Sequence, residues 1–362
     1  MKPQDLSRVP PWTWACPLAA VLVLAAHFVF HPGFPFLVIE AIALIATVFA
    51  AVYHAEVVAH SIGEPLGTLV LSLAVTIIEV SLIVSIMLTH EKANAVLARD
   101  TVFAAVMIVC NGIVGLCLLA GGLRHREQSF QLQGANAALS VLIALTTLTL
   151  ILPNVTVATP GPMFSRAQLV FAAIVSAILY LGFLFVQTVR HRDYFLLPGD
   201  GTEETPAPSA PGKVVALSCG LLLVALASVV LLAESLEPPL EHGLVAIRVP
   251  VGFVGVVIAS LVLLPEGLAS FRAAHANRLQ TSINLALGAV LATIGLTIPV
   301  VAGVSLLLHQ PLTLGLNPEQ AVLLVVTLII SVLTLGTGRT TVLQGIVHLT
   351  LFAVFLFLSI IP

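Results

Sequence analysis

Apolar segments long enough to cross a lipid bilayer follow one another along almost the whole 362-residue chain. A bilayer core about 30 Å thick needs roughly 20 apolar residues per helix. Hydrophobic residues make up 59% of this chain and charged residues 9%, whereas a soluble domain carries roughly 25% charged residues. A soluble fold of this length cannot bury so much apolar surface. The sequence therefore predicts an all-α polytopic membrane protein.

We expect about eleven transmembrane helices on this length rule. They are placed at residues 14–30, 34–53, 66–88, 101–122, 135–152, 167–189, 214–232, 247–269, 284–308, 320–335 and 341–361. The first is interpreted as a retained helix rather than a signal peptide, because no Ala-x-Ala-like cleavage site follows it.

The longest polar interruption, residues 190–213, is rich in proline, glycine and acidic residues without apolar periodicity, which indicates a flexible linker. It divides the chain after the sixth span. We therefore expect four parts. They are residues 1–32 (the N-terminus and an extra first helix), 33–190 (a first five-helix repeat), 191–212 (a cytoplasmic linker) and 213–362 (a second five-helix repeat).

The two halves place their polar residues in the same order. Glu79 lies deep in the third span and Glu266 deep in the eighth. Each is followed by a short basic loop and then by a span that contains small and polar residues. Five helices is an odd number, so the second copy enters the membrane from the opposite side. Such inverted repeats are a common plan of secondary transporters, with the ion site at the midplane.

Lysine and arginine counts set the expected orientation, because basic loops resist translocation. When alternate loops are assigned to two sides, about ten basic residues fall on the side of the N-terminus and about four on the other. We therefore expect the N-terminus and the linker in the cytoplasm, and the C-terminus outside a cell (inner) membrane.

Three acids lie well inside predicted spans: Glu40, Glu79 and Glu266. An ionised carboxylate at the bilayer centre costs at least roughly 2.5 kcal/mol, so each needs a reason to be there. The matched placement of Glu79 and Glu266 predicts that they bind a metal cation or protons. Glu40 has no counterpart in the second half, which leaves a structural role or a peripheral proton path open. Glu64 is an interfacial acid that could gather cations.

Two protons and one Ca²⁺ ion would compete for this pair of carboxylates. Burial and a neighbouring carboxylate both favour the protonated form, whereas a divalent cation favours the charged form. Ca²⁺ takes six to eight oxygen ligands, more than two glutamates supply. Pro265 beside Glu266 predicts a helix break that frees backbone carbonyls. The proposed supporting side chains are Asn111, Thr76, Ser72, Ser260, Thr293 and Thr297, with water.

Other functional classes find little support. A net charge of −3 and a pI near 6.4 give no sign of nucleic-acid binding. The sequence contains no phosphate-binding loop and no zinc-like spacing among its 11 histidines, so we expect no cofactor and no enzymatic activity. His348 and Gln344, four residues apart in the last span, are expected to brace helices by hydrogen bonds.

Several stretches resemble the bacterial ChaA-type calcium/proton antiporters of the calcium/cation antiporter superfamily. They are residues 63–79, 265–267, 288–299 and 336–345. The resemblance implies eleven spans arranged as one plus five plus five, with Glu79 and Glu266 as the ion- and proton-binding acids. The wider pattern has Gly-Asn-Ala before each key glutamate, and this chain has Thr76-Ile77-Ile78 and Leu263-Leu264-Pro265 instead.

Calcium/proton exchange is therefore the first hypothesis for the function. Exchange of Na⁺ or K⁺ for protons at the same site is the second, and ChaA-type members are associated with these ions too. A cation channel or a passive membrane subunit is a third and weaker alternative. The sequence leaves the oligomeric state open.

Overall fold

The structure is a computed structural model that describes residues 9–30, 34–62, 74, 76–81, 83–84, 87, 94–196, 211–246, 249–250 and 252–361. Within these ranges nine helices are long and apolar enough to cross a membrane, or up to ten if one bent pair is a single span. Their positions confirm ten of the expected spans. The other one, residues 66–88, lies largely outside the described residues, as do Glu64, Ser72 and most of the linker.

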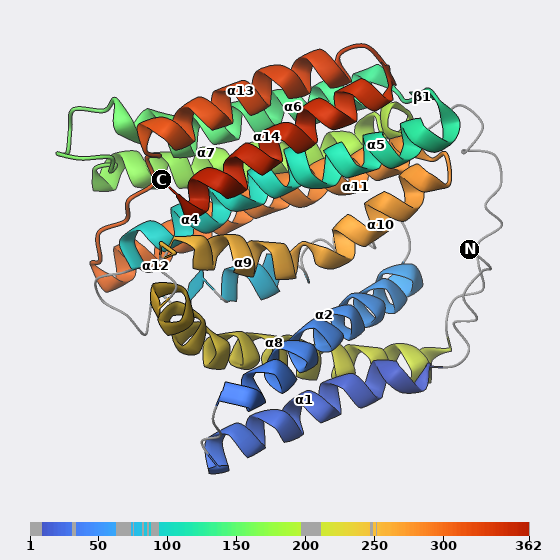
Figure 1. Ribbon diagram of the computed structural model, residues 1–362, viewed down its shortest axis with the longest axis vertical. Helices are drawn as coiled ribbons and strands as arrows, with labels where there is room; N and C mark the ends of the chain where they lie inside the picture. Colours follow the sequence, from blue (N-terminus) through green and yellow to red (C-terminus); the bar gives the residue numbers. More distant parts are fainter. Residues whose placement is uncertain are drawn as a thin grey trace. The chain divides into compact units, whose positions relative to one another are not determined.

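Figure 1 labels these helices and colours them from blue at the N-terminus to red at the C-terminus. The α-helices are α1 (Pro11–Phe30), α2 (Phe34–Ile62), α4 (Asn94–Met107), α5 (Val114–His125), α6 (Leu132–Thr146), α7 (Arg166–Phe185), α8 (Gly212–Ala246), α9 (Phe253–Val262), α10 (Leu264–His275), α11 (Leu279–Ala292), α12 (Ile298–Leu308), α13 (Pro318–Leu335) and α14 (Val342–Ile360). Four π-helical segments interrupt or end spans: η1 (Ile108–Ile113), η2 (Thr147–Ile151), η4 (Val186–Arg190) and η6 (Thr293–Thr297). Two short 3₁₀ segments are η3 (Leu152–Asn154) and η5 (Arg192–Phe195).

Side-chain caps fix where three of these helices begin. Ser165 precedes α7, Asn317 precedes α13 and Thr341 precedes α14, and each forms a capping box with a glutamine three residues later. In such a box two backbone N–H groups that the helix leaves unpaired are satisfied reciprocally. Gln344 therefore caps its own helix instead of bracing a neighbouring one.

The helices form two compact units that cut across the two repeats of the sequence. The first unit contains α1, α2 and α8, that is, the extra helix and the first helix of each repeat, together with the residues around Glu79. In this unit α1, α2 and α8 all pack against one another. Trp12 of α1 packs edge-on against Tyr53 of α2, with ring centroids 5.7 Å apart.

The second unit contains α4 to α7 and nearly all of α9 to α14, and its packing is twofold related. The polar span of the first repeat (α4, η1 and α5) packs on α14, the last helix of the second repeat. The matching span of the second repeat (α11, η6 and α12) packs on α7, the last helix of the first. Glycines allow both approaches: a Cβ atom at Gly115 would lie 2.9 Å from the Cβ of His348, and one at Gly295 would lie 2.4 Å from the Cβ of Tyr180.

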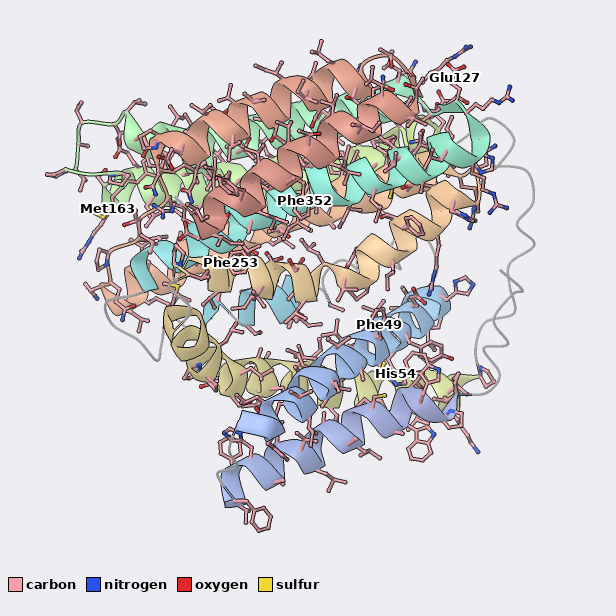
Figure 2. All side chains as sticks on the ribbon, viewed as in Figure 1. Phe49, His54, Glu127, Met163, Phe253 and Phe352 are labelled. Carbon is pink, nitrogen blue, oxygen red and sulfur yellow. The ribbon has the colours of Figure 1, made fainter. Side chains whose placement is uncertain are left out.

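The connections of the second unit repeat this symmetry at opposite ends of its bundle (Figures 1 and 2). Strand β1 (Gln128–Ser129), between α5 and α6, pairs antiparallel with β2 (Arg339–Thr340), between α13 and α14. Met163, between η3 and α7, forms an isolated bridge with Thr313, between α12 and α13. Exchanging the two repeats converts one pairing into the other. The fold is thus one extra helix followed by two inverted repeats, as the sequence predicts.

Candidate functional site

Glu266 lies where the eighth span is broken. Helices α9 and α10 meet at Leu263 with a bend of 57°. Pro265 stands in the first turn of α10 and has no N–H to donate to the carbonyl of Leu261, so the two helices cannot run on as one. The break thus falls two residues before Pro265, close to where the sequence predicts it.

The carboxyl group of Glu266 is held in the first turn of α10, where the helix dipole favours negative charge. Its Oε2 atom is shielded from solvent and, among the described residues, has no hydrogen-bond partner. Ser270, one turn later on the same face, also has a buried hydroxyl without a partner in that part of the chain. Ser260 of α9 is exposed and donates to the carbonyl of Val256, which leaves its oxygen lone pairs unused. The broken span therefore presents oxygen atoms that the described protein does not use.

Glu79 is helical and buried, with 5% of its surface exposed. Thr76 lies three residues earlier on the same helix face and is buried as well. Glu79 belongs to the first compact unit and Glu266 to the second. Glu79 is thus buried inside an apolar span, and Glu266 is partly buried with its Oε2 atom shielded from solvent.

The polar spans of the two repeats carry π-helical segments at matched places. Asn111 lies in η1, and Thr293 and Thr297 are the first and last residues of η6; all three are buried. A π-helical turn breaks the regular backbone hydrogen-bond ladder, and such turns are frequent at functional sites. Thr297 has no partner for its hydroxyl within the described residues. The backbone of these segments is therefore a candidate source of ligands in addition to their side chains.

The side chain of Asn111 points away from Glu266. Gly267, next to Glu266, would place a Cβ atom 3.2 Å from Ile113 of η1, so α10 packs on the side of η1 that carries Ile113. Asn111, two residues earlier, lies on the opposite side, where its Nδ2 donates to Oγ1 of Thr327 over 2.8 Å. The structure therefore brings η1 to Glu266 but turns the Asn111 amide towards α13 and α14.

His348 of α14 binds the same Asn111 amide from the other side, so it braces helices as the sequence predicts. Its Nδ1 lies 3.2 Å from Oδ1 of Asn111, and its Nε2 lies 3.1 Å from Oγ1 of Thr334. Because Oδ1 can only accept, Nδ1 carries the proton and Nε2 accepts from the threonine hydroxyl. Thr327 in turn donates to Sδ of Met107. One directional chain of hydrogen bonds thus joins α13, α14 and the span that contains η1.

Sequence reasoning missed Thr327 and Thr334 in this chain. With Ser331, these two residues form a series at helical spacing that places three hydroxyl groups on one face of α13. This polar face in an apolar span could have predicted an interhelical contact.

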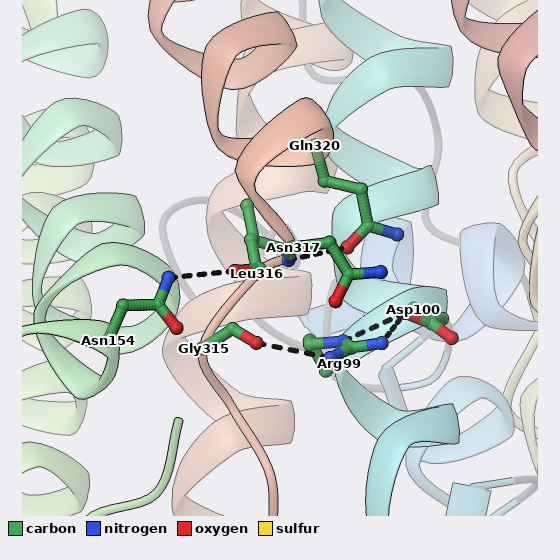
Figure 3. Close-up of polar contacts among 7 residues, drawn as sticks. All are labelled: Arg99, Asp100, Asn154, Gly315, Leu316, Asn317 and Gln320. Carbon is green, nitrogen blue, oxygen red and sulfur yellow. Dashed lines mark hydrogen bonds and ion pairs between the residues drawn. The ribbon is translucent and has the colours of Figure 1, made fainter. Parts of the chain in front are cut away.

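A buried ion pair at one end of the second unit was also missed (Figure 3). Arg99 contacts Asp100 over 2.7 Å and donates from Nη1 to the carbonyl of Gly315 over 3.1 Å. The two side chains are only 7% and 12% exposed. Asn154 donates to the neighbouring carbonyl of Leu316 over 2.8 Å. These bonds fix the connection between α12 and α13 onto the start of α4 and the end of η3.

Comparison with known proteins finds this architecture in one family. The sodium/calcium exchanger protein family matches residues 33–189 and 217–361, which are the two repeats. A Sinorhizobium fredii protein named for ionic transport, y4hA, is 51% identical over 98% of both chains. The sodium-potassium/proton antiporter ChaA of Escherichia coli is 37% identical over 87% of this chain and 86% of its own.

Solved structures share the fold at low sequence identity. Native YfkE has a TM-score of 0.73 at 16% identity and covers 97% of this chain and 100% of its own. The H⁺/Ca²⁺ exchanger CAX has a TM-score of 0.71 at 15% identity and covers 95% of this chain and 87% of its own. The chain belongs to the sodium/calcium exchanger protein family of the calcium/cation antiporter superfamily, and it is a membrane-spanning cation antiporter rather than an enzyme.

Proposed function

We propose that this chain exchanges Ca²⁺ for protons by alternating access, with Glu79 and Glu266 binding the cation or protons in competition. The observation that carries the proposal is the state of Glu266, whose shielded Oε2 lacks a partner in the described residues and sits at a break in a membrane span. A buried oxygen of this kind costs free energy unless a ligand or a proton satisfies it.

Competition between the two loads would couple their transport. Two carboxylates with one Ca²⁺ ion, or with two protons, have no net charge, whereas the empty charged pair is expensive to carry through the barrier. Each carboxylate contributes at most two of the six to eight oxygens that Ca²⁺ takes. The remaining ligands are proposed to be Thr76, Ser72, Ser260, Thr293 and Thr297, the backbone around Asn111 and Pro265, and water.

A second candidate cargo is Na⁺ or K⁺, with one proton remaining on the pair. The observation that favours it is the likeness to ChaA of Escherichia coli, a sodium-potassium/proton antiporter, at 37% identity. The Ca²⁺/H⁺ antiporter of Aphanothece halophytica is 24% identical over 69% of this chain. We further propose that the N-terminus and the linker face the cytoplasm of a bacterial cell, since about ten basic residues fall on that side against four.

The test uses inside-out vesicles with a respiration-driven pH gradient that a quenched amine dye reports. Ca²⁺, Na⁺ and K⁺ are added separately to the wild type and to Glu79→Gln and Glu266→Gln. We expect dequenching by Ca²⁺ in the wild type and none in either variant. Glu319→Gln, an exposed acid at the start of α13, is the matched control and should respond like the wild type.

Each other outcome has a definite meaning. A response to Na⁺ or K⁺ alone would replace the cargo and keep the site. Retained exchange in both glutamine variants would overturn the site. Cation flux without proton movement would overturn the proposed coupling to protons.

A further inference from the structure

Glu40 is a fully buried acid that the exchange site does not use. It lies on α2, its side chain is 0% exposed, and its two oxygens have partners on two other helices. Oε1 lies 2.5 Å from Nδ1 of His27 on α1, and Oε2 accepts a hydrogen bond from Oγ of Ser235 on α8 over 3.3 Å. The pair therefore sits where the extra helix meets the first helix of each repeat.

The chemistry of the pair makes it a site for one proton. With one proton shared between the carboxyl group and the imidazole ring, the pair has no net charge. Removing this proton leaves a carboxylate inside an apolar bundle, and adding a second proton leaves an uncompensated cation; both states are costly there. The His27 side chain is 27% exposed, whereas the Glu40 side chain is fully buried.

Few other charges face the pair from the three helices. Helix α1 contains no other acidic, basic or histidine residue. On α2 the next such residue is His54, 14 positions further on, or about 21 Å along the helix axis. On α8 the neighbour of Ser235 is the half-buried Glu234; Glu237, Glu241 and His242 follow in sequence. Glu234 is thus the half-buried described acid nearest to Ser235 in sequence.

We propose that His27 and Glu40 form a second proton-binding site, separate from Glu79 and Glu266, whose single proton keeps α1 docked on α2 and α8. Loss of that proton would leave the Glu40 charge without its partner and loosen α1. The pair would then set the pH range over which α2 and α8 can support transport. This last step rests on the proposed antiport, whereas the proton-dependent docking does not.

The fluorescence of the two tryptophans of the chain reports whether α1 is docked on α2. Both Trp12 and Trp14 lie on this helix, and Trp12 contacts Tyr53 of α2. Intrinsic fluorescence of the protein in lipid nanodiscs therefore reports how α1 is docked. We expect one pH-dependent transition in the wild type and its loss in Glu40→Gln. The double variant His27→Gln/Glu40→Gln, which can keep a hydrogen bond but has no ionisable pair, should lose it too.

His54 needs its own control, because its Nε2 lies 3.0 Å from the carbonyl of Thr13 between the two tryptophans. His54→Gln should retain the transition. Ser235→Ala keeps both ionisable groups and removes one hydrogen bond, so we expect a shift of about one pH unit rather than a loss. If the Glu40 variants fail to fold, this shift remains the test.

Exchange in vesicles is then measured against pH in the double glutamine variant. We expect its pH profile to lose one limb or to shift by about one pH unit. An unchanged fluorescence transition in Glu40→Gln, or no shift in Ser235→Ala, would overturn the docking site. An unchanged pH profile would overturn its role in transport. A wild type without exchange would disprove the proposed Ca²⁺/proton exchange, while the fluorescence result still decides the docking.

Discussion

Nδ1 of His348 on α14 lies 3.2 Å from Oδ1 of Asn111 in η1, so the last helix of the second repeat holds the π-helical turn of the first. His348→Leu should leave that oxygen buried and unpaired, at a cost of about 1–3 kcal/mol. Thermal unfolding of the purified protein measures this loss. Thr350→Ala, an exposed change on the same helix, is the control and should change stability by less than about 0.5 kcal/mol. Equal melting temperatures for both variants would contradict the role of the contact.

The approach of α5 and α14 predicts a severe effect of one added methyl group. A Cβ atom at Gly345 would lie 2.5 Å from the backbone nitrogen of Leu119 and 2.9 Å from the carbonyl oxygen of Gly115. Since these are backbone atoms, the helices must separate, and we expect Gly345→Ala to lower the unfolding free energy by about 1–3 kcal/mol. Gly303→Ala on α12 meets nothing within 4 Å and should be neutral or stabilising. Equal stability of both variants would refute the close packing.

Pro265→Ala tests whether the broken helix serves transport. The alanine supplies an N–H group and removes the ring, so α9 and α10 can join, and the variant should be more stable by up to about 3 kcal/mol. Exchange should fall at least about tenfold because the Glu266 carboxyl group changes direction. Melting temperature and vesicle exchange are measured on the same preparation, with Pro318→Ala at the start of α13 as control. Full exchange in Pro265→Ala would show that the bend is only structural.

The ion pair of Arg99 and Asp100 should behave as a buried pair. Arg99→Met leaves Asp100 and the carbonyl of Gly315 without their partner, and we expect a loss of about 3–5 kcal/mol. The double variant Arg99→Met/Asp100→Leu removes both charges and should recover part of that loss. A double-mutant cycle from thermal unfolding measures the coupling. Additive effects would show that the pair contributes nothing beyond its separate residues.

Bound cargo should stabilise the folded protein. At a cation concentration of about 100 times Kd the gain is about 2.7 kcal/mol. Protons compete for the same oxygens, so the gain should shrink as the pH falls. Glu266→Gln should abolish it, and the exposed Glu319→Gln should keep it. Melting temperatures with and without Ca²⁺, Na⁺ or K⁺, recorded across pH, measure the effect. A cation-dependent gain in Glu266→Gln would mean that the ion binds elsewhere.

The sequence was sufficient for ten of the eleven spans, the inverted repeats and the broken helix at Pro265, because hydropathy and proline act locally along the chain. It could not pair His348 with Asn111, since these residues are 237 positions apart and no periodicity connects them. Nor did it show that α2 and α8 leave their repeats to form a unit with α1. Glu40 illustrates the limit: burial inside an apolar span was predictable, but its partners on two other helices were not.

The bond from Arg99 to the carbonyl of Gly315 spans 216 residues, so it has a consequence for how the protein is made. At typical translation rates of 5–20 residues per second, Gly315 is synthesised about 10–40 s after Arg99. The first half therefore enters the membrane before the carbonyl partner of Arg99 and the strand partner of β1 have been synthesised. A ribosome that stalls after the linker therefore leaves a first half that lacks both of these long-range contacts.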